Sequence, residues 1–350
     1  AYFVGNYATN NMLVLLNNAG QIMYQFELTG TPVATRVDGQ RLYILMIGQG
    51  PEPRVTKRGA IYVVTDPEVG PELVLDGLSR PVDFELADLN SDGLNDFVVC
   101  EYGHYSGALS WFEQNTNGSF VKHVLKNEPG AIAVELHDFD KDGLLDLGVL
   151  MSQGDEGIDI HFNKGNGVFE EKRILRFPPV YGSSSFSLVD FNEDGKVDIL
   201  YTNGDNADSS PVLKNYHGIR IFQAWQAGVY EEVLFYPLHG AISAQAADFD
   251  QNGHLDIAAI SYFPDYTTQP VESFVLLMDE GQMNYTPHSF DGAVRGRWFV
   301  MDVGDIDGDA DVDIILGSNI GFGPRGDQTG LFKQWEEEAL SYVILQNERL

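Results

Sequence analysis

Cysteine and basic residues are scarce in this 350-residue chain. Its one cysteine, Cys100, excludes a disulfide within the chain and any cysteine-based zinc or c-type haem site. Lys and Arg number 21 against 52 Asp and Glu, which gives a formal charge of −31. That balance excludes a general nucleic-acid binder and argues against docking on an anionic membrane surface.

Several familiar signals are also missing. No run of 18 apolar residues occurs, so the sequence predicts no transmembrane helix. There is no nucleophile elbow, P-loop or dinucleotide-binding fingerprint. With 43% hydrophobic and 21% charged residues the chain is nevertheless globular, and its 37 glycines favour an all-β class.

A repeated nine-residue acidic pattern dominates the sequence. Its five copies start 50, 52, 58 and 57 residues apart, and each lies between a run of small or apolar residues and a β-type run. Further strands follow each copy, often opened by glycine, as at Gly330. Four short strands in a repeat of about 50 residues indicate the blade of a β-propeller. The five copies occupy residues 88–96, 138–146, 190–198, 248–256 and 305–313.

Strand patterns continue upstream of the first acidic copy. Residues 33–75 contain four strand-like runs, and residues 2–28 contain three, which match the last three strands of a blade. The sequence therefore predicts a single domain over residues 1–350, a seven-bladed β-propeller whose first blade lacks one strand. That gap predicts either chain before Ala1 or an unusual closure. The predicted blades are residues 1–30, 31–78, 79–128, 129–178, 179–237, 238–292 and 293–350.

The acidic pattern predicts calcium sites, up to five in number. Calcium takes six to eight hard oxygen ligands, and acids at positions 1, 3, 5 and 9 with a carbonyl at position 7 supply them around a turn. Asp-Gly turns that merely end strands would explain the glycine at position 6 but not four oxygen-bearing side chains per loop. The fourth loop has Asn252 at position 5, and the fifth has Ala310 at position 6, which demands a strained φ or a different turn.

Twenty-five residues make up the predicted calcium ligands. In the first three loops they are Asp88, Asn90, Asp92, Leu94, Asp96, Asp138, Asp140, Asp142, Leu144, Asp146, Asp190, Asn192, Asp194, Lys196 and Asp198. In the last two they are Asp248, Asp250, Asn252, His254, Asp256, Asp305, Asp307, Asp309, Asp311 and Asp313.

These loops and their spacing resemble the FG-GAP/VCBS repeat family, the calcium-loop β-propellers that include the integrin α head. Residues 181–190, 200–205 and 213–218 are further similar to bacterial VCBS-repeat proteins. The resemblance implies an extracytoplasmic protein, secreted, periplasmic or on the cell surface, that calcium stabilises. It does not fix an activity, because the fold hosts binding proteins and enzymes alike.

The face opposite the calcium loops is the predicted ligand face. Basic residues are enriched in its connections, which favours an anionic ligand such as a uronate or sulfated glycan, although exposed loops are charged in any protein. The candidate ligand-binding residues are Tyr201, Asn203, Asp205, Lys214 and Arg297. The insertion at 203–217 is the richest of these connections in polar groups.

Two hypotheses about function follow. The first is a binding module for a glycan or a protein that catalyses nothing. The second is a polysaccharide lyase, because a tyrosine or histidine beside a cation can take the proton α to a carboxylate. The candidate catalytic residues are Tyr181, Lys214, Tyr216, His217 and His239, which local strand packing would also explain.

Overall fold

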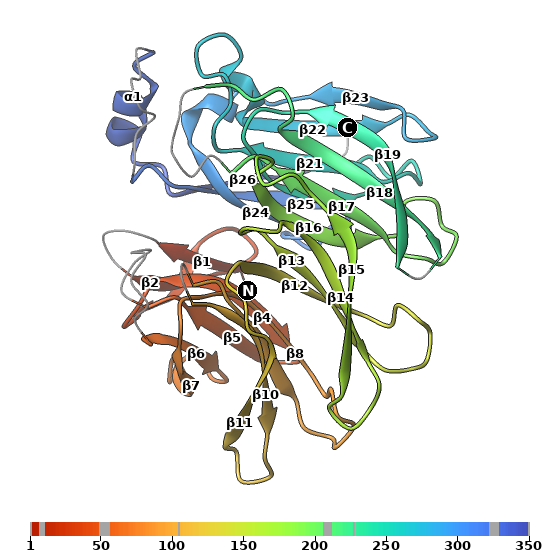
Figure 1. Cartoon of the computed structure of the whole chain (residues 1–350). Coiled ribbons are helices and arrows are strands. Elements are labelled where there is room, and N and C mark those ends of the chain that lie inside the picture. Colours follow the sequence, from red (N-terminus) through yellow and green to blue (C-terminus); the bar gives the residue numbers. More distant parts are fainter. Residues whose placement is uncertain are drawn as a thin grey trace. The chain divides into compact units, whose positions relative to one another are not determined.

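The structure, a computed structural model, describes residues 2–6, 11–48, 57–103, 106–205, 212–226, 228–321 and 329–348. They divide into two compact units, each treated by itself below. The first is chiefly Phe3–Asn17 and Ile22–Pro179, and the second is chiefly Asn18–Gln21 and Val180–Leu350. Both consist almost entirely of antiparallel sheets, so the predicted all-β propeller class is confirmed (Figure 1).

The first unit contains three four-stranded sheets, each built from consecutive strands. The three sheets comprise β4 (Pro32–Asp38), β5 (Arg41–Met46), β6 (Gly59–Val64) and β7 (Glu72–Leu78); β8 (Pro81–Ala87), β9 (Asp96–Glu101), β10 (Ala108–Gln114) and β11 (Phe120–Lys126); and β12 (Ala131–His137), β13 (Asp146–Met151), β14 (Gly157–Asn163) and β15 (Phe169–Arg176). A three-stranded sheet precedes them, made of β1 (Tyr2–Asn6), β2 (Met12–Leu16) and β3 (Ile22–Glu27).

The second unit contains two four-stranded sheets and one three-stranded sheet. The strands are β16 (Ser183–Val189), β17 (Asp198–Asn203), β18 (Gly218–Gln226) and β19 (Val229–Pro237); β20 (Ala241–Ala247), β21 (Asp256–Ser261), β22 (Phe274–Asp279) and β23 (Tyr285–His288); and β24 (Trp298–Gly304), β25 (Asp313–Ser318) and β26 (Tyr342–Leu345). Short 3₁₀ turns, η1 (Pro270–Ser273) and η2 (Ala293–Arg295), lie between strands.

The propeller has six blades, so the predicted number of seven is wrong. Each blade begins with the same hairpin, in which the register shifts just after the first residue of the first strand. These hairpins are β4–β5, β8–β9, β12–β13, β16–β17, β20–β21 and β24–β25. The sheet of β1, β2 and β3, which lies within the predicted first blade of residues 1–30, has three strands, and in its described pairing of β2 with β3 the register shifts near the end of β2 instead. Apolar runs alone cannot distinguish a blade from an added sheet, and this is why the sequence overcounted.

The C-terminal blade also departs from the expected four strands. The strand predicted at Gly330 is instead the start of helix α1 (Leu331–Glu338), inserted between β25 and β26. Gly330 has a φ of 85°, and the residues that follow are mostly good helix formers. Trp335 anchors the helix, since it is 1% exposed and its indole donates to the Val294 carbonyl at 2.8 Å.

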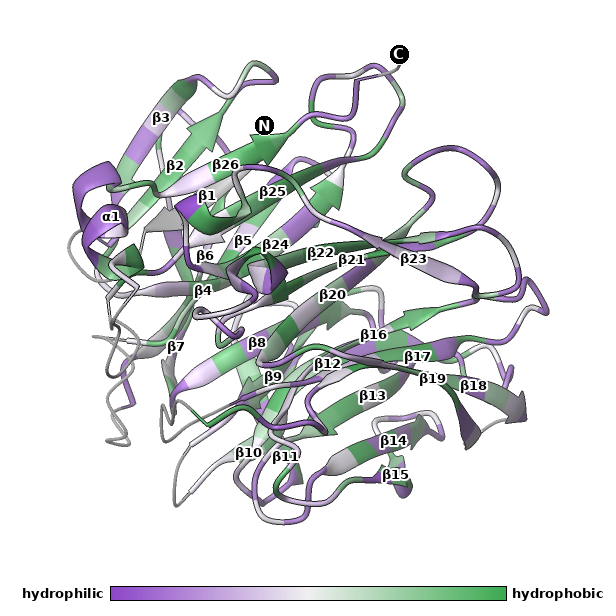
Figure 2. Cartoon of the chain, turned by 90° about the horizontal axis from the view of Figure 1, so that it is seen from above, coloured by the Kyte–Doolittle hydropathy of each residue, from purple (hydrophilic) through white to green (hydrophobic). Residues whose placement is uncertain are grey.

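The core lies between neighbouring sheets. The second strands β9, β13, β17 and β21 are buried at every position. In the first unit, for example, Val98 and Leu109 of one blade pack with Val134 and Val149 of the next. Figure 2 shows β13, β21 and β22 as apolar over most of their length. Within the described ranges, no helix has the length and apolarity needed to span a membrane.

Candidate metal sites and the opposite loop face

Each acidic loop joins the first strand of a blade to the second. Two of the loops belong to the first unit and three to the second. The last aspartate of each loop opens the second strand, as Asp146 opens β13. The loops therefore begin and end on rigid strands, which fixes both ends of each candidate site.

Backbone N–H groups of each loop donate hydrogen bonds to the acidic side chains of the same loop. In the second loop Asp138 accepts from the amides of Asp142 at 3.0 Å and Gly143 at 2.8 Å, and Asp142 accepts from Leu144 at 2.9 Å. The first, third and fourth loops repeat these bonds. The carboxylates are thus oriented by the chain itself.

The fifth loop reaches a similar turn with different residues. The other four loops carry a non-glycine residue at position 4 with φ between 57° and 65°, followed by glycine at position 6. Here Gly308 takes position 4 with φ 91°, and Ala310 takes position 6 with φ 74°. Ala310 therefore adopts the left-handed backbone that favours glycine, which is the strained alternative of the two that the sequence left open.

The aspartate at position 9 has a structural role in all five loops. Asp146 is fully buried, and its two oxygens accept from the backbone amides of Asn163 at 2.7 Å and Phe139 at 2.9 Å. Burial raises the pKa of Asp146, and the two amides partly offset that rise. The same pair of backbone bonds holds Asp96, Asp198, Asp256 and Asp313.

Asparagines at the end of the third strand join neighbouring loops. Asn163, at the end of β14, donates through its side-chain amide to the Leu89 carbonyl of the first loop at 2.9 Å, while its backbone amide holds Asp146. In the second unit Asn347 donates to the Phe249 carbonyl at 2.6 Å and holds Asp313. Neither asparagine was a predicted site residue: Asn163 is the last residue of β14, and Asn347 lies two residues beyond the end of β26.

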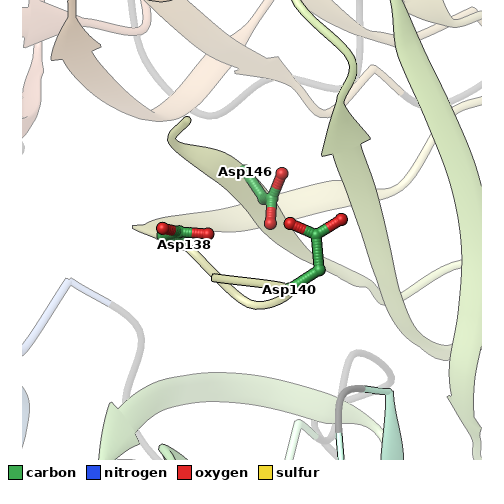
Figure 3. Close-up of side chains that lie close together, drawn as sticks. All are labelled: Asp138, Asp140 and Asp146. Atoms are coloured by element: carbon green, nitrogen blue, oxygen red, sulfur yellow. The ribbon is translucent and has the colours of Figure 1, made fainter. Parts of the chain in front are cut away.

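Three loops gather carboxylates closely enough to share one cation. In the second loop ligand atoms of Asp138, Asp140 and Asp146 all lie within 4.8 Å of one another (Figure 3). Equivalent groups in the fourth and fifth loops meet the same limit. The first and third loops have Asn90 and Asn192 at position 3, where an amide oxygen replaces one carboxylate.

Asp311 distinguishes the fifth loop. Its side chain is 2% exposed, and neither of its carboxylate oxygens has a hydrogen-bond partner. Burial raises the pKa of Asp311 to about 6, together with the side-chain interaction with Asp309, which favours a protonated carboxyl, and the charges of Asp309, Asp313 and Asp307. A buried carboxylate with no donor, surrounded by other carboxylates, is the environment that a cation relieves.

The opposite loop face brings several predicted ligand residues together in the second unit. The rings of Tyr181 and Tyr216 stack at 5.7 Å, and the Arg220 guanidinium lies 4.7 Å from the Tyr181 ring centre. The His239 ring lies 3.3 Å from the carbonyl of Lys214, which is half-buried. Asp205 is exposed beside them, while residues 206–211 of the predicted insertion lie outside the described residues.

Other members of this group are buried among the strands. Tyr201 and Asn203 are 0% exposed: the Tyr201 hydroxyl bonds to Ser183, and the Asn203 amide donates to the Tyr181 and Tyr216 carbonyls. His217 is 2% exposed, and its Nδ1 lies 3.3 Å from the Gly240 amide. Burial lowers the pKa of His217 to about 4, with smaller contributions from Lys214, His239 and Arg220.

Two arginines differ in how the prediction compares with the structure: Arg297 was a predicted ligand residue, and Arg220 was not. Arg297 is 2% exposed and lies 3.6 Å from the ring centre of Tyr262, so it is held by another blade rather than by the group around Tyr181. Arg220 was not a predicted site residue, yet it lies between the Tyr181 and Phe235 rings and binds the Asn203 side chain. Its position within a strand gave no sequence signal.

The first unit has a hollow on its own second-to-third and fourth-to-first connections. It measures about 460 Å³ and is lined by Glu128, Pro129, Gln153, Gly154 and Asp155. Carboxylates and an amide are groups that bind hydroxyl or cationic ligands. None of these residues was a sequence-predicted ligand.

Comparison with solved structures supports the fold. A protein from Lactobacillus plantarum is 12% identical, with a TM-score of 0.56 over 91% of this chain and 87% of that one. BBS1N, solved in complex with ARL6DN, is 11% identical, with a TM-score of 0.50 over 89% and 86%. An exo-β-1,3-galactanase from Phanerochaete chrysosporium is 8% identical, with a TM-score of 0.43 over 87% and 75%. At 11–12% identity the first two likenesses concern the fold alone.

Sequence comparison identifies the repeats. No curated protein sequence matches the chain. The family model of the FG-GAP-like repeat, however, matches residues 88–149 and 138–201, which contain the first three acidic loops. The chain thus carries FG-GAP-like repeats on a β-propeller frame, as the spacing of its acidic loops predicts.

Proposed function

We propose that this chain is a calcium-stabilised propeller that serves as a binding module for a glycan or a protein outside the cytoplasm. The main support for calcium binding is Asp311. Its carboxylate is buried without a hydrogen-bond partner in a loop that contains four further aspartates. The repetition of the same loop geometry in five blades extends the argument to the other sites.

The donor set of each loop fits calcium. Side-chain oxygens at positions 1, 3, 5 and 9 and the carbonyl at position 7 are hard oxygen donors of the kind that calcium prefers over softer ligands. In the fifth loop the Asp311 carboxylate adds to this set. A bound cation would neutralise carboxylates that otherwise repel one another, and binding to the folded state alone stabilises that state.

The binding part of the proposal rests on the loop face. Tyr181, Tyr216 and Lys214 form a partly exposed group there, and the hollow beside Asp155 offers a second polar surface. The likeness to bacterial VCBS-repeat proteins and the extracytoplasmic location belong to the same proposal. Calcium is far more abundant outside cells, where loops of modest affinity fill.

The test combines metal analysis with ligand screening. Metal-free protein titrated with calcium should bind up to five ions, and its melting temperature should rise. The loaded protein is then screened against uronate-containing and sulfated polysaccharides and neutral glycans, with chelated protein as the control. Absence of calcium binding by calorimetry would overturn the calcium part, and absence of any calcium-dependent ligand would overturn the binding part.

The alternative of a polysaccharide lyase is less well supported. Its candidate base, His217, is 2% exposed and has a pKa of about 4, so it meets neither solvent nor substrate in this arrangement. The other four candidates, Tyr181, Lys214, Tyr216 and His239, are partly exposed. The lyase hypothesis would be supported if the protein released unsaturated sugar ends from an acidic polysaccharide, as measured by their absorbance.

A further inference from the structure

Strand β19 is the outer edge of its blade. Among the strands that the structure describes, the order β16–β17–β18–β19 leaves one side of β19 without a neighbour (Figure 1). Exposed edges of this kind template pairing with another chain, and proteins protect them with lysine, proline or short length.

Three of the other outer strands in the four-stranded blades carry such protection, and the fourth, β7, does not. Strand β11 has Lys122 and Lys126, β15 has three basic residues, β7 is interrupted by Gly77, and β23 has only four residues, including Pro287. Strand β19 has nine residues, none of them basic, and its proline is the last residue. Among the described outer strands it is the longest that has no basic residue, although it carries Glu231 and Glu232 and its pairing with β18 has two register shifts.

Apolar side chains are exposed along this edge. Val229, Val233 and Phe235 are 41%, 40% and 39% exposed, and Trp225 at the end of β18 is 63% exposed. Large apolar residues gathered at one exposed edge are typical of interaction sites. Trp225 and β19 together define the edge surface discussed below.

The charges on the edge surface select the partner. Glu231 and Glu232 lie in the middle of β19, and Glu232 pairs with Arg220 at 3.2 Å. Among the described residues no ion pair of Glu231 is found. If a second copy of the chain paired through the same edge, Glu231 and Glu232 of both copies would lie close together. Their like charges would repel one another and disfavour this pairing. The net charge of −31 adds to that repulsion.

We propose that the edge surface docks an extended segment of a partner protein that adds as a strand to β19 and alternates apolar with basic residues. The added strand would pair with the free backbone groups, its apolar residues would cover Val233, Phe235 and Trp225, and its basic residues would meet Glu231. This surface adjoins the loop face through Arg220, which lies between the Tyr181 and Phe235 rings, and it extends the proposed function.

The experiment uses a labelled nine-residue peptide that alternates valine and lysine, matched in length to β19. Fluorescence anisotropy is measured for the parent chain, Val233→Lys and the control Val124→Lys, which places lysine on the exposed, already protected edge of β11. We expect saturable binding to the parent, at least about tenfold weaker binding to Val233→Lys, and no change in Val124→Lys. Melting curves with calcium show that both variants are folded.

Two altered peptides and one further variant complete the design. Replacing lysine by glutamate, or methylating alternate backbone nitrogens, should abolish binding, and Glu231→Lys should make the glutamate peptide bind. The proposal is overturned if the parent shows no saturable binding up to about 1 mM peptide. The proposal is also overturned if the methylated peptide binds as tightly as the unmethylated one, or if Val233→Lys and Val124→Lys lose the same amount of binding affinity. A dimer of the parent chain that Val233→Lys dissociates would instead assign the edge to a second copy.

Discussion

The second acidic loop allows structural and metal-binding aspartates to be separated. Asp146 holds two backbone amides in a fully buried position, whereas Asp140 lies at the surface of the loop and pairs with Lys164 at 2.8 Å. The two substitutions Asp146→Asn and Asp140→Asn each remove one charge from the same loop. They should nevertheless differ in their dependence on calcium.

The magnitudes follow from the bonds that are lost. An asparagine at 146 retains one acceptor oxygen and leaves the other buried amide facing an N–H donor, which costs about 1–3 kcal/mol with or without calcium. At 140 no backbone group loses its partner, so stability in chelator should change little. If calcium is present at about 100 times its Kd it contributes about 2.7 kcal/mol, and a tenfold loss of affinity removes about 1.4 kcal/mol of that.

The assay is urea unfolding, followed by tryptophan fluorescence, in chelator and in excess calcium. Trp111 reports on the first unit, which contains this loop. Asp146→Asn should lower the free energy of unfolding in both media, and Asp140→Asn only in calcium. If Asp146→Asn matched the parent in chelator, its two backbone bonds would not be the stabilising element that the structure indicates.

Three further predictions concern other parts of the chain. Exhaustive chelation, verified by elemental analysis, should lower the melting temperature by several degrees, and an unchanged curve would contradict calcium-linked stability. Ala310→Gly should raise the free energy of unfolding by about 1 kcal/mol, because the φ of 74° then costs nothing, whereas the matched change Gly253→Ala should lower it. Burial, then Glu85 and Asp83, raises the pKa of Glu135 to about 7 from 4.5, so its charge destabilises the fold increasingly from pH 4.5 to 7 and fully above. Glu135→Gln should therefore stabilise by about 2 kcal/mol at pH 8 and hardly at pH 5, and a pH-independent effect would refute this reasoning.

The repeated loop could be predicted because a short, contiguous run of residues specifies it. An aspartate or asparagine at alternate positions, a glycine and a following apolar run specify a turn between two strands, whatever the rest of the chain does. The loops and the second strands that follow them, such as β9 and β13, accordingly lie where the sequence placed them. The calcium ligands themselves remain predictions.

The blade number and the last blade were not predictable in the same way. Whether residues 1–30 form a blade depends on a hairpin register that hydrophobic runs do not encode, and the segment after Gly330 was read from two apolar residues while its helix depends on Trp335 packing. The burial of two predicted site residues on the loop face was also not predicted from the sequence. Tyr201 and His217 are polar enough to suggest a site, but their contacts across strands place them inside the blade.

The asparagines that link neighbouring loops would couple the proposed binding of an ion in one loop to its binding in the next. Asn163 connects the first loop to the second, and Asn347 connects the fourth to the fifth. In each case the side-chain amide reaches the neighbouring loop while the backbone N–H of the same residue holds a buried aspartate. Tightening one loop around an ion therefore restrains its neighbour before that neighbour is filled. Calcium uptake should accordingly be positively cooperative within these two pairs, steeper than five independent sites would give, and Asn163→Ala should flatten the isotherm of the first pair while leaving the second unchanged.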